Sequence, residues 1–424
     1  MKVEKNSLFK NKQYLYLISS QIVSSLGDWL DLLALLALVS INLKASPMEM
    51  TYLMLCFTVP MILFSPIAGV LADKYDRKKL MIISDVVRAF VVSGIVFSNS
   101  LWMVYILLFI KSSFSALFMP SKNGKLKEIV SNEQIQQAIS ISSMIDNGGK
   151  ILGPMIGGLL VVSFGVKPAF YIDAVTFILS ALLLVKVKRA QFDKLESTKK
   201  KDNSKVSFFN DMKEGLSFIK TVPLLLSGLL IFSTVILVIQ IADTQIMILL
   251  REIPGRHVQL VGYSMSASGL GMFIMAAILS KKEIHSFFKY LSFGTIGIGV
   301  GFATPVFFIH SPIIVLNILM PFLFFLIGLS AAAVGVSFNV YAQKNTPVHF
   351  SGRTFSTING MTNGSAVIGM MIGGILVESM GVIATYELSG SLLVLIGIIS
   401  LFLKPALKGS VKVAKGQRGI QEEA

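Results

Sequence analysis

Long apolar runs alternate with short polar segments along almost the whole chain. Twelve such runs lie near residues 14–41, 48–72, 80–99, 101–121, 136–163, 165–187, 223–249, 258–280, 287–309, 312–342, 352–379 and 382–404. A helix that crosses a membrane needs about 20 apolar residues, and each run is long enough to supply them. The pattern therefore predicts an all-α integral membrane protein with twelve transmembrane helices.

The first run begins just after Lys10 and Lys12, a position that a secretory signal peptide also occupies. It is longer than the apolar core of such a peptide, and no small-residue cleavage site follows it. We therefore expect this run to be retained as the first transmembrane helix.

The composition agrees with a membrane protein. Of the 424 residues, 54% are hydrophobic and only 14% are charged, whereas a soluble domain carries about 25% charged residues. The net charge of +15 would suit nucleic-acid binding, but the basic residues are gathered in alternate loops. That distribution follows the positive-inside rule, so it argues against a nucleic-acid partner and for contact with an anionic lipid leaflet.

The orientation in the membrane follows from the same distribution. One set of loops holds most of the basic residues, among them Lys74, Arg77, Lys78, Lys122, Lys125 and Lys127. The loops between them hold only Lys44, Lys167, Arg251 and Arg256. We expect a multi-pass protein of the cell membrane with both termini in the cytoplasm.

Enzyme and metal chemistry have little support in this sequence. Cys56 is the only cysteine, and the four histidines stand singly at positions 257, 285, 310 and 349. No ATP-binding loop, metal-binding pair or nucleophile motif is present. We therefore predict a protein without a cofactor or a catalytic site, in which any pumping is driven by an ion gradient. A non-transporting membrane receptor or scaffold, or an intramembrane enzyme, is the alternative.

The two halves of the chain repeat one glycine pattern. Asn147, Gly148, Gly153, Gly157, Gly158 and Gly165 recur at a constant offset as Asn363, Gly364, Gly369, Gly373, Gly374 and Gly381. The repeat predicts two pseudo-symmetric six-helix halves, at residues 1–187 and 223–404. We expect a polar linker at 188–222, with a surface helix near 206–220, and a cytoplasmic tail at 405–424.

The loop between the second and third runs carries a compact charged motif. Its pattern, G-x-x-x-D-(K/R)-x-x-R-(K/R), comprises Gly69, Asp73, Lys74, Arg77 and Lys78. The motif resembles the loop 2–3 signature of the major facilitator superfamily, except that Asp76 stands where that family usually has glycine. The resemblance covers nearly the whole chain and implies a secondary transporter with its substrate site near the bilayer midplane.

The resemblance also implies a gating role for this loop. Asp73 and Arg77 lie at ion-pairing distance if the second helix continues for one more turn. The acid is expected to engage the N-terminus of the eleventh helix, near Arg353, where the helix dipole favours a carboxylate. Breaking that contact would then release the cytoplasmic side during transport.

The fifth run resembles the helix-5 signature of proton-driven exporters in the same superfamily. It includes Gly149, Gly153, Pro154, Gly157 and Gly158. Glycines at this spacing also let two helices approach closely in lipid, so packing alone is the other interpretation. Pro154 should bend the helix because it removes one backbone hydrogen bond.

The whole pattern resembles most closely the macrolide-efflux-like branch of these exporters. The features that carry this resemblance are Gly27-Asp28, Ser84-Asp85 with Arg88, Pro120 at the end of the fourth run, and Tyr171-Ile-Asp173. Lys111 stands near the place where related drug antiporters often have an arginine, so it joins the candidates for proton handling.

Ionisable residues inside apolar runs are costly, so they are candidates for coupling or substrate binding. Asp28 and Asp31 lie three residues apart near the middle of the first run, on one helical face. Two carboxylates at that spacing oppose each other's ionisation, which suits a site that takes up and releases a proton. The alternative is that Asp28 only bonds to the backbone or to a neighbouring helix.

Two further sites are open to two interpretations each. Asp146 and Lys150 are expected to form an ion pair one helical turn apart, as a specialised polar site or as a self-neutralised structural pair. Asp243, near the outer end of the seventh helix, is a substrate contact or a solvated helix end.

Together these features predict an exporter of small amphipathic, macrolide- or drug-like compounds that works by proton antiport and alternating access. Its expected partners are a small-molecule substrate, protons and the lipid bilayer, and it is expected to be a monomer. The carboxylates of the first helix favour cationic or weakly basic cargo, whereas Lys150 would equally serve an anion. Siderophore, metal or lysophospholipid transport is the alternative within this class.

Overall fold

The computed structural model describes the backbone of residues 8–131, 134–188, 208–252, 257–280, 286–308, 311–347 and 351–422. Helices account for nearly all of these residues, and no β-strand occurs in these ranges. The all-α class predicted from the sequence is therefore confirmed for the part of the chain that is described.

The first helices follow the predicted runs closely. They are α1 (Lys12–Ala37), extended by a π-helical turn at Leu38–Asn42, then α2 (Pro47–Lys74), α3 (Arg77–Ile95), α4 (Leu101–Ile129), α5 (Ile135–Phe164) and α6 (Val166–Val185). Side-chain caps fix several of their starts. Asn11 accepts hydrogen bonds from two backbone N–H groups at the start of α1, and Ser46 and Glu49 form a capping box at the start of α2.

The later helices begin with the short linker helix α7 (Phe208–Thr221), which matches the surface helix expected near 206–220. The others are α8 (Pro223–Asp243), α9 (Ile246–Arg251), α10 (His257–Ser280), α11 (Phe287–Phe308), α12 (Ile313–Asn345), α13 (Ser351–Met380) and α14 (Val382–Glu422). The run predicted at 223–249 is thus two helices, and α14 extends past residue 404, where the last predicted run ends.

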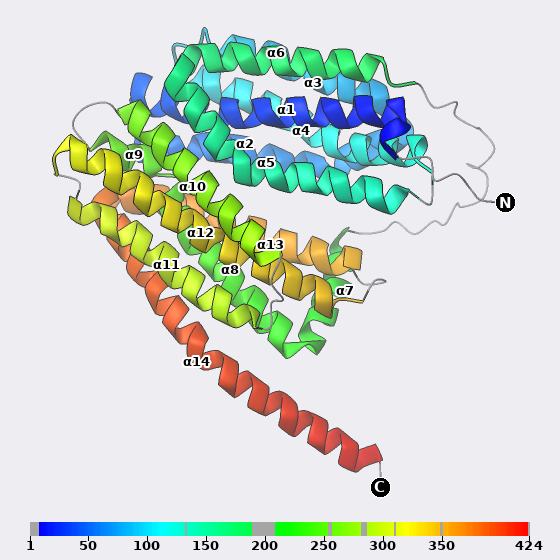
Figure 1. The fold of residues 1–424 in the computed structure, drawn as a ribbon, viewed down its shortest axis with the longest axis vertical. Coiled ribbons are helices and arrows are strands. Elements are labelled where there is room, and N and C mark those ends of the chain that lie inside the picture. Colours follow the sequence, from blue (N-terminus) through cyan, green and yellow to red (C-terminus); the bar gives the residue numbers. More distant parts are fainter. Residues whose placement is uncertain are drawn as a thin grey trace. The chain divides into compact units, whose positions relative to one another are not determined.

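The chain divides into two compact units, residues 1–199 with 254–269 and residues 200–253 with 270–424. In the first unit α1 packs against α5 and α6, α3 packs against α4 and α6, and α2 packs against α4. Figure 1 shows α1, α3, α4 and α6 side by side in this unit. In the second unit α11 packs against α12 and α14, and α13 packs against α7 and α8.

Ten helical segments in the described ranges are long and apolar enough to span a membrane. Helices α3 and α5 are not among the ten, although both exist where a transmembrane helix was predicted. Charge explains the case of α3, which carries Asp85 and Arg88 in its middle as well as a basic first turn. These interior charges belong to the cluster described below.

The sequence repeat is visible in the helices themselves. A shift of 216 residues moves both ends of α5 onto α13, from 135 to 351 and from 164 to 380. Gly165 and Gly381, which follow the two helices, have φ values of 86° and 84°. Only glycine adopts such a positive φ without strain, so both copies end their helix at a position that requires glycine.

The fourth helix corrects one sequence prediction. The run was expected to end near residue 121, with Pro120 at its end and with Lys122 and Lys125 in a cytoplasmic loop. In the structure Pro120 lies inside α4, which continues to Ile129, and both lysines are 1% exposed. Their long apolar stems are buried while each ammonium group meets a carboxylate, so the helix can continue through them.

Candidate functional site

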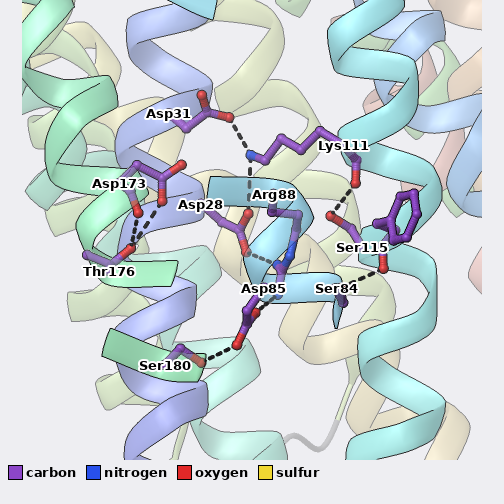
Figure 2. A network of polar contacts seen from close by, with 11 residues as sticks. Asp28, Asp31, Ser84, Asp85, Arg88, Lys111, Ser115, Asp173, Thr176 and Ser180 are labelled. Carbon is purple, nitrogen blue, oxygen red and sulfur yellow. Dashed lines mark hydrogen bonds and ion pairs between the residues drawn. The ribbon is translucent and has the colours of Figure 1, made fainter. Parts of the chain in front are cut away.

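Six charged side chains meet inside the first unit, where α1, α3, α4 and α6 come together (Figure 2). This buried charge cluster consists of Asp28 and Asp31 on α1, Asp85 and Arg88 on α3, Lys111 on α4 and Asp173 on α6. All except Asp28 are at most 2% exposed. Burial of a charged side chain in an apolar interior costs solvation free energy, and close pairing with an opposite charge offsets part of that cost.

Lys111 connects α4 to α1. Its ammonium group donates a hydrogen bond to Asp31 and lies 3.3 Å from Oδ1 of Asp28. The two candidate carboxylates of α1 therefore do face the same neighbour. The ring of Phe177 lies 5.6 Å from the same ammonium group and adds a cation–π contact.

Arg88 is the second cation of the cluster. Its guanidinium group pairs with Asp85 one turn earlier on α3 and lies 3.4 Å from Oδ2 of Asp28. The hydroxyl of Ser180 on α6 donates to the other oxygen of Asp85 at 2.6 Å. Aromatic rings close around the guanidinium carbon, with Phe177 at 4.3 Å and Phe118 at 5.0 Å. Asp28 thus touches both cations, and it is the only member of the cluster that is partly exposed.

Asp173 differs from the other three carboxylates. It is fully buried, and no cation among the described side chains lies within ion-pairing distance of it. Oδ1 lies 3.1 Å from the hydroxyl of Thr176, and Oδ2 has no hydrogen-bond partner. Gly27 makes this arrangement possible, because a Cβ atom there would collide with the Asp173 carboxylate and the Thr176 hydroxyl.

The charges of this cluster do not balance when every group is ionised. Four carboxylates share two cations, Arg88 and Lys111. A buried charge without a partner is strongly disfavoured. The carboxylates of such a cluster can bind protons. A charged ligand that approaches the cluster changes how many protons they hold.

A second polar group lies on α5. Oδ1 of Asp146 accepts a hydrogen bond from Nε2 of Gln21 on α1 at 2.6 Å, and Oδ2 accepts one from Nζ of Lys122 on α4 at 3.0 Å. Gln21 also exchanges hydrogen bonds with Ser142. These contacts fasten α1, α4 and α5 to one another. The side chain of Lys150 lies outside the described residues, so its expected pair with Asp146 stays a prediction.

A cavity of about 530 Å³ connects the two polar groups. Asp28 and Arg88 line one part of it, and Lys122 and Asp146 line another. The apolar lining includes Trp29, Leu32, Phe57, Met61, Phe118 and Met119. The side chains of Asp28 and Asp146 are 41% and 27% exposed, whereas those of Arg88 and Lys122 are 3% and 1% exposed. The charge that this cavity offers to a ligand is therefore acidic.

The loop motif forms a separate polar group. Arg77 donates to the carboxylates of Asp73 at 3.3 Å and Glu128 at 2.9 Å, as well as to the carbonyl oxygens of Ala72 and Gly124. The expected pair of Asp73 with Arg77 is thus present, although α2 ends at Lys74. A Cβ atom on Gly69 would meet nothing within 4 Å.

Two other residues of this loop stabilise helix ends. Lys78 donates to the carbonyl oxygens of Val185, the last residue of α6, and of Val187 just after it, at 2.6 and 2.5 Å. Asp76 accepts a hydrogen bond from the backbone N–H of Lys78 and so caps α3. This cap gives the aspartate a structural role where the family usually has glycine. The contact expected between Asp73 and the helix at Arg353 stays a prediction. In the second unit Arg353 pairs with Glu214 at 2.6 Å.

The glycines of the fifth helix pack against α1. A Cβ atom on Gly153 would collide with the ring of Trp29, and one on Gly157 would lie 2.9 Å from the Trp29 carbonyl oxygen. Gly149 lies near the same ring, and Gly158 faces the backbone of Gly262 in α10. These contacts agree with the packing interpretation of the signature. The side chain of Pro154 lies outside the described residues.

Asp243 is the last residue of α8 in the second unit, and its side chain is exposed. The apolar segment continues directly into α9, so the choice between a substrate contact and a solvated helix end stays open.

Sequence reasoning did not select four of the residues that form these groups. Asp85, Arg88 and Asp173 served only to support a family resemblance, although each is an ionisable residue inside an apolar run, the signal that selected Asp28 and Asp31. Lys122 was assigned to a loop because its charge hid the continuation of α4.

Comparison with known proteins settles the family. The sequence profile of the Major Facilitator Superfamily matches residues 17–366. The chain belongs to this superfamily. The MFS-type transporter YfiS of Bacillus subtilis (strain 168) is 40% identical over 416 residues, which cover 98% of this chain and 99% of that protein. This membership confirms the resemblance of the loop motif and identifies a multi-pass membrane transporter.

More distant relatives have names that mention a cargo. The staphyloferrin A transporter of Staphylococcus aureus is 25% identical and covers 96% of this chain and 99% of its own length. Macrolide efflux protein A of Streptococcus pyogenes is 24% identical, over 84% of this chain and 87% of its own length. Among solved structures, the nucleoside transporter NupG has a TM-score of 0.68 at 15% identity and covers 92% of this chain and 98% of its own. That likeness establishes the fold.

Proposed function

We propose that this transporter exports small amphipathic compounds of a macrolide- or drug-like kind by proton antiport and alternating access. It would do so as a monomer with twelve membrane-spanning helices in two pseudo-symmetric halves and with both termini in the cytoplasm. The matching limits of α5 and α13 support the two halves. The alternation of basic loops supports the orientation.

The observation that carries the proposal is the buried charge cluster and its opening at Asp28. An antiporter needs a group that exchanges protons and a site that binds cargo. Occupancy of either site must alter the affinity of the other. In this cluster carboxylates outnumber cations, and Asp28 belongs both to the cluster and to the lining of the cavity. A charged ligand in the cavity therefore alters the electrostatic balance of the groups that can hold a proton.

The lining of the cavity supports a cationic amphipath as cargo. The accessible charged atoms are the carboxylate oxygens of Asp28 and Asp146, because the cations beside them are covered. Aromatic and methionine side chains supply an apolar surface that adapts to bulky ligands. One relative is named a macrolide efflux protein, which agrees with this class of cargo.

Siderophore transport is the second candidate, because the relative named for staphyloferrin A aligns with nearly the whole chain. If the cargo is a siderophore, we expect its transport not to depend on the partly exposed carboxylates of Asp28 and Asp146. A variant with Asp28→Asn would then transport its cargo as the wild type does, whereas export of a cation would be lost.

The test compares wild type, Asp28→Asn and Asp31→Asn in a pump-deficient bacterium. Accumulation of ethidium, a permanently charged aromatic cation, and of a macrolide is followed with and without a protonophore. We expect the wild type to lower accumulation, and both variants and the protonophore to abolish the effect. The exposed acid Glu378 on α13 provides a matched control, and Glu378→Gln should export normally. If well-inserted wild type lowers the accumulation of neither compound, this substrate class is wrong.

A further inference from the structure

Asp173 is the one carboxylate of the buried charge cluster that makes no described ion pair. Asp31 pairs with Lys111, Asp85 pairs with Arg88, and Asp28 lies within 3.4 Å of both cations. The two cations are therefore already in contact with three carboxylates. A fourth negative charge in the cluster would have no counterion of its own, so the neutral form of Asp173 fits its surroundings best.

The hydrogen bonds of Thr176 fit a neutral acid as well. Its hydroxyl has one hydrogen, and the shorter of its two contacts, at 2.7 Å, leads to the backbone carbonyl of Asp173. The contact with Oδ1 at 3.1 Å is then free to be made in the opposite sense, with a protonated Asp173 as donor and the hydroxyl as acceptor. The other carboxyl oxygen, Oδ2, has no partner, which a charged carboxylate would not tolerate well.

Neighbouring charges allow the same group to release its proton. The charged groups that act on Asp173 are Lys111 on α4 and Asp31 and Asp28 on α1. On α3, Arg88 and Asp85 pair with each other. Lys111 favours the ionised form of Asp173, while the two acids of α1 oppose it. A change in how Lys111 is shared therefore shifts the balance between the two protonation states.

We propose that Asp173 is the residue that binds and releases the coupled proton. This inference rests on the antiport function proposed above and adds the proton site to it. On release, the O–H bond of the carboxyl breaks, the proton is transferred to water, and the positive charge of Lys111 stabilises the carboxylate left behind.

Cargo and proton exclude each other through Asp28. A cation bound at Asp28 takes over part of the pairing that this carboxylate makes with Lys111, which makes Lys111 more available to balance an ionised Asp173. Binding of cargo therefore expels the proton, and binding of the proton expels the cargo. This reciprocity is what antiport requires.

Infrared spectroscopy of the purified full-length protein tests the protonation itself. A difference spectrum between acidic and alkaline pH reports the carbonyl stretch of carboxyl groups that gain a proton. We expect a band in the wild type that is absent in Asp173→Asn, shifted in Asp173→Glu and unchanged in Glu378→Gln. Thr176→Val should shift the wild-type band, since it removes the hydroxyl that the acid contacts. An unchanged band in Asp173→Asn overturns the proposal.

Transport in proteoliposomes provides a second readout. Asp173→Asn imitates the protonated acid, so we expect it to lose ethidium accumulation driven by a pH gradient but to keep exchange of ethidium across the membrane without a gradient. Asp173→Glu should retain part of the driven accumulation. Full driven accumulation in Asp173→Asn contradicts the proposal.

The two experiments separate this inference from the function on which it rests. If the wild type moves neither ethidium nor a macrolide, the proposed function fails, while the infrared band still decides whether Asp173 binds a proton. If the wild type shows gradient-driven transport and the band survives in Asp173→Asn, only the assignment of the proton site fails. Should Asp173→Asn not fold, Asp173→Glu and Thr176→Val carry the same comparison.

Discussion

Lys111 on α4 forms ion pairs with two carboxylates of α1, with Asp31 directly and with Oδ1 of Asp28 at 3.3 Å. Asp31 and Lys111 are each 1% exposed, so neither can turn to water when the other is lost. We expect Lys111→Met to lower the free energy of unfolding by about 3–5 kcal/mol, because it leaves a buried charge without its partner. Unfolding of the detergent-solubilised protein with rising temperature or SDS measures the change.

A double variant separates the pair from simple loss of packing. Combining Lys111→Met with Asp31→Leu removes both charges and should recover most of the stability lost in the single variant. Transport should remain absent in the double variant, because the charged groups that we assign to coupling are gone. Equal stability of wild type and Lys111→Met would show that Asp31 does not depend on this lysine.

Two glycines of α5 should respond differently to the same substitution. A Cβ atom on Gly153 would collide with the ring of Trp29, whereas one on Gly148 would meet nothing within 4 Å. We expect Gly153→Ala to cost about 1–3 kcal/mol through overpacking. Gly148→Ala should leave stability unchanged or raise it by about 0.5–1 kcal/mol, since alanine favours the helix.

Fluorescence reports the displacement that this argument requires. The chain has two tryptophans, so in a Trp102→Phe background the emission comes from Trp29 alone. The spectrum should change in Gly153→Ala and stay the same in Gly148→Ala. Identical spectra and melting temperatures for the two variants would refute the packing interpretation of the helix-5 signature.

The sequence predicted those parts of the structure that depend on local pattern. The lengths of the apolar runs indicated where the helices lie. The repeated glycines marked α5 and α13, two helices of equal length that are followed by Gly165 and Gly381, both with positive φ. The loop motif was recognisable because its members are close in sequence. The pair of Asp73 with Arg77, one turn apart, is of this local kind.

The partners of the buried charges could not be predicted in the same way. Asp28, Lys111 and Asp173 come from three helices, and nothing in their spacing shows that they meet. Lys122 illustrates a second obstacle. A hydropathy pattern ends a helix at a lysine, but it cannot show that Asp146 and Gln21 lie opposite, where they make burial of the lysine tolerable. What the sequence does not show is which side chains are neighbours in the tertiary structure.

Neutralising Asp146 should weaken both the fold and the binding of cations. Asp146→Asn leaves the ammonium of Lys122, which is 1% exposed, facing an amide. We expect a loss of about 1–3 kcal/mol in stability, at the low end because water reaches the carboxylate. The affinity for ethidium should fall by roughly tenfold, which equals about 1.4 kcal/mol.

Measurements at different ionic strengths distinguish the loss of cation binding in Asp146→Asn from its loss of stability. If Asp146 attracts cargo by its charge, ethidium binding to the wild type weakens as ionic strength rises, and binding to Asp146→Asn responds less. A variant that binds ethidium as tightly as the wild type does would remove Asp146 from the cargo site while leaving its structural role intact.

Arg77 should not be replaceable by lysine. Its guanidinium group reaches two carboxylates and two backbone carbonyls from different directions, contacting Glu128, Asp73, Ala72 and Gly124. An ammonium group is a single point charge and cannot make this set of contacts. We expect Arg77→Lys to lose about 1 kcal/mol or more of stability, the value of a net hydrogen bond, and to transport ethidium nearly as slowly as Arg77→Ala.

Lys79 provides the matched control, because it is exposed in the same first turn of α3. Lys79→Ala should keep the melting temperature and the initial rate of ethidium transport of the wild type. Measured together at equal protein levels, the three variants separate the geometry of Arg77 from the charge of the loop. If Arg77→Lys matches the wild type while Arg77→Ala does not, charge alone is sufficient at this position, and the specific contacts of the guanidinium group have no functional role.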